Sequence, residues 1–309
     1  ELRGWAVAVS GSMVVRGVPN GQRASLKRLV GYFGSSLLLE DNAGTVYVEK
    51  CQHGFQGGRL SIRNSAQVAL NEVVAIDARI ESSFVTMNRG LSDASFPQDP
   101  LLTVIRSVVV LGNTVLVGSR ANYNGSTCTV IVPPGEAISG YDSVLVLGAG
   151  TSVRGGRLNV GGGSCPPISL EANAIGGSNI QVIQDPAATV SQIGPGVTLQ
   201  TTPQPTLDGI VGDELQGRMD FDLLGTPGSP AAMIASLPGD PMLTCFGFQW
   251  VNLNAYLVAD VGVVDPLGHR RVSFPFPSGY PLGEPMVFQS IVLEAGSLVW
   301  STPSVIVRN

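Results

Sequence analysis

Carboxylates are the side chains of this chain with the clearest capacity for chemistry. Two carboxyl groups that flank a glycosidic bond can act as general acid and as base or nucleophile. Four acidic residues near two predicted loops could form such a cluster: Asp77, Glu81, Asp93 and Asp99. Elsewhere the acidic positions do not repeat, because Glu40 corresponds to Arg63 in the next copy of a recurring pattern. This alternation indicates charge pairing between neighbouring strands, so we predict no catalytic residues.

Cysteine and histidine are scarce, with four and two residues. No CxxC motif is present, so we expect no metal site. His53 follows Cys51, but Cys51 falls on an inward position, where a buried free thiol is expected and no exposed thiolate is available for catalysis. Three full pairings of the cysteines are open in a secreted protein. We favour a Cys128–Cys165 disulfide, because both residues flank glycine-rich corners about two repeat lengths apart.

The composition excludes several classes of partner. The 309 residues include 18 Lys+Arg and 23 Asp+Glu, for a net charge of -5, and no basic stripe that could follow a phosphate backbone. There is no glycine-rich loop that opens a helix, so we expect no nucleotide or other cofactor. No apolar run reaches about 18 residues, which argues against membrane insertion. Only 13% of the residues are charged, about half of the usual share, and such a surface is compatible with packing against other copies.

A recurring sequence pattern predicts the structural elements that position the acidic residues and cysteines. Residues 37–51, 60–73 and 102–114 each read as an alternating apolar segment, a polar corner and a second alternating apolar segment. Leu39 and Ile62 are 23 residues apart, and Ile62 and Val104 are 42 apart, close to two periods of about 21. Short strands repeated at such a period predict a β-solenoid, whose lateral faces and ends carry its function.

One column of this repeat holds Asn42, Ser65 and Ser107. Coils of a solenoid stack about 4.8 Å apart, so small polar side chains at one corner can bond up and down the stack. We therefore interpret the column as a structural ladder; a row of sugar-binding residues is the alternative.

The C-terminal third has a different pattern. Residues 201–206 (TTPQPT) predict a linker between a domain of residues 1–200 and a domain of residues 207–309. Six or seven short strands with Pro-Gly turns follow, which predicts an antiparallel β-sandwich. Asp220 and Asp222 share one face of the first of these strands, and we expect that face to be solvated. Phe246, Phe248 and Trp250 alternate along another strand, where core packing is expected and a sugar-stacking platform is the alternative.

The run from Met13 to Gln22, followed by the repeats, resembles secreted right-handed parallel β-helix proteins of the pectate-lyase-like superfamily, of the kind found in planctomycetes and myxobacteria. Residues 219–237 resemble the β-sandwich tails of such secreted and surface proteins. The resemblance implies the fold and an extracellular location. No catalytic motif of pectate lyases or polygalacturonases maps onto this chain, so the resemblance carries no activity with it.

Together these observations predict an all-β protein, a right-handed parallel β-helix (solenoid) followed by an antiparallel β-sandwich. We expect a secreted, non-catalytic structural or adhesive protein of the extracellular space or cell surface that assembles with other copies of itself. Open solenoid ends expose strand edges, and head-to-tail contacts between them produce filaments. The terminal strands could also pair with a neighbouring subunit, so the assembly candidates are Trp5, Val7, Val9, Val305 and Val307. The abrupt, strand-like start of the chain suggests that it is processed or truncated.

Two alternatives remain open. One is a polysaccharide lyase or glycoside hydrolase on the β-helix, with the sandwich as a carbohydrate-binding module. It predicts a cluster of carboxylates in a lateral groove. The other is a monomeric adhesin that binds carbohydrate. In both alternatives the binding partner is an extracellular polysaccharide.

Overall fold

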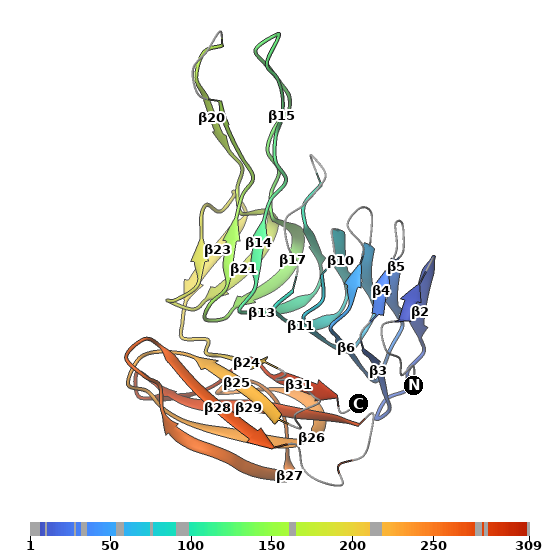
Figure 1. Cartoon of the computed structure of the whole chain (residues 1–309), viewed down its shortest axis with the longest axis vertical. Helices are drawn as coiled ribbons and strands as arrows, with labels where there is room; N and C mark the ends of the chain where they lie inside the picture. The colour runs from blue at the N-terminus through green and yellow to red at the C-terminus, as the bar shows by residue number, and fades with distance from the viewer. Residues whose placement is uncertain are drawn as a thin grey trace.

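The computed structural model describes residues 7–9, 11–27, 29–31, 36–53, 59–74, 77–90, 99–160, 165–210, 218–275, 280 and 284–307. These residues form strands and turns and contain no helix, so the chain is all-β as predicted (Figure 1). A thirteen-stranded parallel sheet curls into a nearly closed solenoid, and antiparallel sheets formed by the C-terminal third lie beneath it in the view of Figure 1.

The solenoid has two long faces and a shorter third side. The first face consists of β2 (Ser12–Arg16), β5 (Ser36–Glu40), β8 (Arg59–Arg63), β10 (Asp77–Glu81), β12 (Leu102–Ile105) and the first halves of β17 (Ile138–Leu147) and β21 (Ile175–Gln184). The second face consists of β3 (Arg23–Lys27), β6 (Thr45–Glu49), β9 (Gln67–Asn71), β11 (Phe84–Asn88), β13 (Val108–Gly112), the second halves of β17 and β21, and β23 (Val197–Thr201). The third side comprises β1 (Val7–Val9), β4 (Leu29–Gly31) and β7 (Gln52–His53) near one end, and β14 (Val115–Val117), β18 (Ser152–Arg154) and β22 (Thr189–Val190) further along.

The register confirms the repeat columns read from the sequence. Glu40 of β5 lies opposite Arg63 of β8, which lies opposite Glu81 of β10. Arg63 and Arg106 approach Glu81 at 3.9 and 3.0 Å, so charges of opposite sign do alternate up this face. Exposed pairs of this kind contribute at most about 1 kcal/mol each. These ion pairs therefore mainly keep like charges on neighbouring coils from facing each other, and they add little to the stability of the fold.

The corner between the two faces contains the predicted polar ladder. Asn42 Nδ2 donates to Ser65 Oγ (3.3 Å), and the Ser65 backbone N–H donates to Ser83 Oγ (3.0 Å). Ser83 and Ser107 continue the series through their own N–H groups, ending on Ser143 Oγ. The residue before each step has a left-handed backbone, which turns the chain from one face to the next: Asp41, Asn64, Ser82, Arg106 and Asp142. Asn and Asp tolerate this conformation better than most residues, which explains the polar bias of the corner.

Inward-facing columns of Leu, Ile and Val fill the solenoid. The column Val46, Val68, Val85, Val109, Leu145 and Val182 is buried throughout. Cys51 is fully buried and donates to the carbonyl oxygen of Glu49, as expected for a core thiol.

The C-terminal third forms two antiparallel sheets. One contains β24 (Thr206–Ile210), β25 (Arg218–Leu224) and β28 (His269–Pro275). The other contains β26 (Pro230–Thr244), β27 (Gly247–Val263), β29 (Pro285–Glu294), β30 (Ser297–Trp300) and β31 (Ser304–Val307). Both sheets contribute to one core, in which the rings of Phe221 and Phe288 lie 4.4 Å apart. We call these sheets the antiparallel part.

The expectation of a solvated acidic face on β25 is wrong for Asp222, which is only 7% exposed. The neighbouring strand β28 covers this carboxylate with basic side chains. His269 Nδ1 lies 2.9 Å and Arg271 Nε 3.7 Å from Asp222 Oδ2. The sequence of β25 does not reveal which strand lies beside it, so the burial of Asp222 could not be predicted.

The antiparallel part packs against the outer side of the second face. Tyr47 and Ala69 of the solenoid share a buried cluster with Trp250, Trp300 and Val305. This contact explains why all five residues of β6 are buried, on both sides of the strand. Strands covered on both sides read as continuous apolar runs, as Val108–Leu111 does in the sequence.

Two hairpins project from the opposite side of the solenoid (Figure 1, top). One is β15 (Asn122–Asn124) with β16 (Thr129–Val132), and the other is β19 (Arg157–Val160) with β20 (Ile168–Glu171). The disulfide favoured from the sequence is present: Cys128 and Cys165 join the two hairpins near their tips. We call the joined hairpins the arm.

Candidate assembly surface

The last strand of the second face leaves the solenoid open at one end. Among the described strands, β23 pairs only with β21. Leu199 of β23 continues the buried column that ends in Val182, yet it is 46% exposed because no further coil covers it. The open end therefore presents a core position to the surroundings.

The chemistry of this end suits contact with another strand. None of the five residues of β23 carries a charge. One edge of β23 has no strand partner in the described residues, so its backbone N–H and C=O groups are available to a further strand. Val197 of the same strand and Ile193 are apolar side chains that are partly buried against the solenoid core. The end thus combines a hydrogen-bonding edge with an apolar centre.

The opposite end of the solenoid begins with strands that also have a single strand partner, although β3 carries Arg23 and Lys27 and its inward residue Leu26 is buried. Within the part of the chain that the structure describes, β2 pairs only with β5, and β3 pairs only with β6. Met13 and Val15 are partly buried against the core, so they form the first members of inward columns.

The structure places the predicted assembly residues in two different settings. Val7 and Val9 lie on β1, opposite Leu29 and Gly31 of β4, near the first coils of the solenoid. Trp5 lies outside the described residues.

The C-terminal strand β31 lies inside the molecule. It pairs with β29, where Val307 is opposite Pro285 and Val305 is opposite Val287. Val305 is 6% exposed and packs towards the solenoid. This internal contact leaves the solenoid ends as the better candidates for assembly. Nothing in the sequence pattern of residues 197–199 indicates that Leu199 would be uncovered.

An open groove of about 400 Å³ lies on the side of the solenoid, at the base of the arm. Its lining consists of Pro100, Pro134, Gly135, Glu136, Ser139, Glu171, Ala172 and Asn173. Arg157 Nη2 donates to Glu171 at 2.9 Å, and this hydrogen bond lowers the pKa of the Glu171 carboxyl. A general acid needs a raised pKa, so Glu171 suits an electrostatic role better than proton donation. Sequence reasoning missed this groove because its residues come from separate coils.

The four-residue acidic cluster considered from the sequence is divided between different contacts. Asp77 Oδ2 lies 3.2 Å from Arg59 Nε, and partial burial raises the pKa of the Asp77 carboxyl, with a smaller contribution from the charge of Asp99. Glu81 is occupied by the arginines of the first face, and Asp93 lies outside the described residues. Among the described residues no group of three or more His, Cys, Asp or Glu could hold a metal ion.

The aromatic row of β27 is mainly packed inside the molecule. Trp250 is fully buried, and the Phe248 ring lies 4.7 Å from the ring of Phe84. Phe246 is 39% exposed, but it precedes the strand. Core packing is therefore confirmed for Trp250, and the row does not form a platform for sugar rings.

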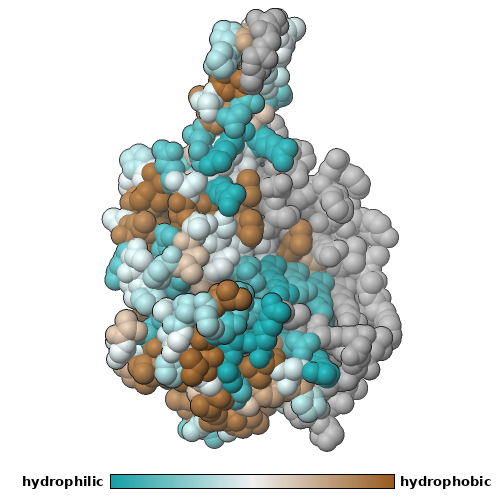
Figure 2. Space-filling model, turned by 60° about the vertical axis from the view of Figure 1, so that its left-hand side comes forward, coloured by the Kyte–Doolittle hydropathy of each residue, from teal (hydrophilic) through white to brown (hydrophobic). Residues whose placement is uncertain are grey.

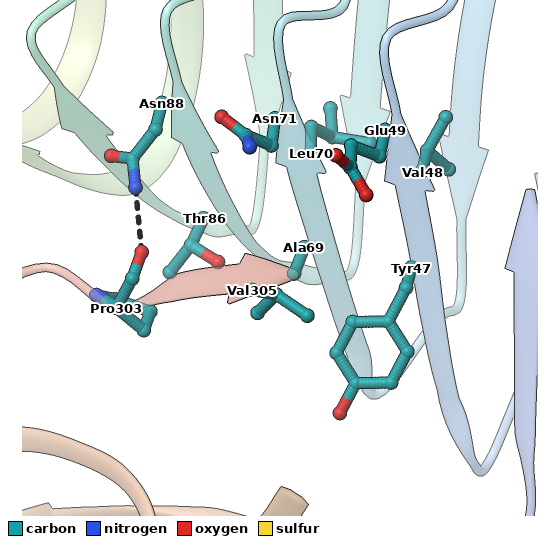
Figure 3. A pocket seen from close by; sticks show the side chains of 10 residues that line it. All are labelled: Tyr47, Val48, Glu49, Ala69, Leu70, Asn71, Thr86, Asn88, Pro303 and Val305. Carbon is teal, nitrogen blue, oxygen red and sulfur yellow. Dashed lines mark hydrogen bonds between the residues drawn. The ribbon is translucent and has the colours of Figure 1, made fainter. Parts of the chain in front are cut away.

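A small cavity of about 10 Å³ lies where β31 meets the second face (Figure 3). Asn88 Nδ2 donates to the carbonyl oxygen of Pro303 at 2.6 Å across this contact. Both polar atoms of the Asn71 side chain and Oγ1 of Thr86 are buried with no hydrogen-bond partner among the described residues. The space matches a single water, so the cavity fits an internal hydration site and is too small for a substrate.

No protein-family model matches this chain, and no curated protein matches it either. Within the described residues, no helix is long and apolar enough to cross a membrane.

Proposed function

We propose that this protein is a secreted, non-catalytic structural or adhesive protein whose copies stack end to end. In this proposal the solenoid is a right-handed parallel β-helix and the antiparallel part is a β-sandwich attached to its side. The observation that carries the proposal is the bare last strand, where Leu199 is 46% exposed although the six column members before it, from Val46 to Val182, are buried. The function resides in the contact between molecules, with other copies as partners.

The single strand partner of each end strand supports a head-to-tail contact. The uncharged edge of β23 would receive the first strands of the next copy and bury Leu199 against Ala24, its counterpart in the first coil. Such a contact uses two different surfaces, so each copy leaves one end free for the next. The result is a filament with the repeat of the solenoid itself.

The disulfide is consistent with an extracellular location. Disulfides persist in oxidising environments and are rare in the cytosol of most organisms. The Cys128–Cys165 bond lies near the tips of the arm, where the hairpins project away from the solenoid. The arm would project sideways from a filament, within reach of an external surface.

Replacing Leu199 with lysine tests the proposal. A charge at the open end would have to be buried in each contact, so Leu199→Lys should abolish filaments seen by negative-stain electron microscopy. Val115→Lys is the matched control, because Val115 is also an exposed apolar residue (54%) but lies on the third side of the solenoid. Filaments formed equally by wild type and Leu199→Lys would refute stacking through this end. Dispersed wild-type particles would refute self-assembly.

A further inference from the structure

We propose that the groove at the base of the arm binds a primary alkylammonium group, the lysine side chain of a partner protein. The groove lies on the side of the solenoid, away from the stacking strands, so this site does not depend on the stacking contact. Most of its lining comes from the ends of the two hairpins, residues 134–136 after β16 and residues 171–173 at the end of β20.

The Glu136 carboxylate is the main charged group of the groove. Among the described residues it has neither an ion pair nor a hydrogen bond. It lies against Gly176 of β21, where the Cβ atom of any other residue would overlap it. Ser139 of β17 is the strand neighbour of Gly176, so its hydroxyl lies on the same side of the first face. Glycine at position 176 therefore makes room for an uncompensated carboxylate beside a hydroxyl group.

The charge around this carboxylate favours a cation. The second carboxylate of the groove, that of Glu171, is compensated by Arg157 at 2.9 Å. Asp99 is exposed and precedes the lining residue Pro100, so it adds a further negative charge close by. Figure 2 shows hydrophilic residues gathered where the arm joins the solenoid. A groove with this net negative charge attracts cations and repels acidic polymers.

The lining favours an organic cation over a metal ion. Ca²⁺ takes about six to eight oxygen ligands, whereas the described residues contain no group of three or more His, Cys, Asp or Glu that could hold a metal. The volume of about 400 Å³ exceeds that of a single ion and is in the range of small-molecule sites. Pro100, Pro134 and Ala172 supply apolar surface, against which an alkyl stem can pack.

A lysine side chain combines the charge and the stem that this groove requires. Its ammonium group is a compact charge with several N–H donors, so it can bond to a carboxylate and a hydroxyl together. None of the described lining residues is aromatic, which disfavours a sugar ring as the ligand. This chain contains only two lysines, Lys27, which is buried, and Lys50, which is only partly exposed. The lysine therefore comes from a different protein.

Ligand-observed NMR with the full chain tests the proposal. The probe is Nα-acetyl-lysine amide, and the matched control ligand is Nα-acetyl-norleucine amide, which has the alkyl stem without the ammonium group. We expect a dissociation constant of about 1 mM for the lysine probe, as for a small ligand in an open site. Added salt should weaken this binding, because the groove is open to solvent. The norleucine probe should show no saturable binding.

Two variants separate the position of the carboxylate from the charge of the protein. Glu136→Gln should raise the dissociation constant about tenfold, because it removes the charge that faces the ammonium group. Gly176→Ala keeps every charge but displaces the carboxylate, so it should weaken binding several-fold. Asp142→Asn is the matched control, since it removes an exposed carboxylate of β17 outside the groove and should leave the affinity unchanged. Circular dichroism confirms that each variant is folded.

Three results would overturn the proposal. They are equal binding of the two probes, no saturation by the lysine probe up to about 10 mM, and an unchanged affinity in Glu136→Gln. Binding of 1,4-diaminobutane at least about tenfold more tightly than the lysine probe would overturn it in favour of a free diamine. None of these results depends on whether the protein forms filaments, so the site and the stacking contact can fail separately.

Discussion

At the scale of single residues, one buried carboxylate connects the two parts of the molecule. Asp208 of β24 is 1% exposed, and its Oδ2 accepts hydrogen bonds from Arg89 Nε (2.5 Å) and Asn113 Nδ2 (2.6 Å). Both donors lie at a left-handed corner of the solenoid. Burial raises the pKa of the Asp208 carboxyl, and Arg89 opposes this shift. The ionised form of the Asp208 carboxyl therefore depends on the positive charge of Arg89.

Arg89→Ala should lower the free energy of unfolding by about 3 kcal/mol at pH 7, because it leaves a buried charge without its partner. The folded-state pKa of Asp208 is already raised, so its contribution to stability is greatest below the unfolded value of 3.8 and is lost as pH rises. Without Arg89 the pKa rises further. The cost of the substitution should therefore shrink as pH falls towards 4, which urea unfolding at several pH values would measure.

Arg106→Ala is the matched control for this prediction. Arg106 has the same left-handed backbone as Arg89, so the effect of alanine on the backbone is the same in both variants. Its ion pair with Glu81 is exposed, and its loss should cost less than about 1 kcal/mol. Equal losses for the two variants, or a loss at Arg89 that does not change with pH, would contradict the role given to Asp208.

At the scale of elements, the sequence predicts the strands better than it predicts their neighbours. The corner ladder was predictable because equivalent positions of stacked coils hold small polar residues. Asn42, Ser65 and Ser107 occupy such positions. β25 (Arg218–Leu224) is the first of the short strands predicted for the C-terminal third, and its apolar residues alternate as expected for a strand. The burial of Asp222, the groove at Glu136 and the bare end at Leu199 depend on contacts between distant segments. No local pattern reports such contacts.

The arm offers the clearest test at this scale. The Cys128–Cys165 bond closes a loop with a sequence separation of 37, for which a chain-entropy model gives about 4 kcal/mol. The double variant Cys128→Ser/Cys165→Ser should therefore unfold at a lower guanidinium concentration than wild type. Cys245→Ser is the control, since Cys245 is exposed and free, and it should unfold like wild type. An unchanged midpoint for the double variant would show that the arm does not unfold together with the solenoid.

At the scale of the whole molecule, the antiparallel part and the solenoid share one buried contact. The Phe84 ring of the second face lies 4.7 Å from the Phe248 ring and 5.7 Å from the Trp250 ring. Asn88 and Arg89 add polar bonds to β24 and to the segment before β31 beside this apolar cluster. A contact of this kind makes the two parts stabilise each other, so we expect the wild-type protein to unfold in a single transition.

Phe84→Ala should separate that transition into two. The substitution removes ring contacts from the centre of the interface, at a cost of about 2 to 3 kcal/mol that falls on the contact between the parts. Trp250 and Trp300 lie in this interface, so tryptophan fluorescence should change at a lower urea concentration than far-ultraviolet circular dichroism. Phe84→Leu keeps most of the apolar volume and should retain coincident transitions. Coincident curves in Phe84→Ala would mean that the remaining contacts suffice to couple the parts, and separate curves already in wild type would show that the parts fold independently.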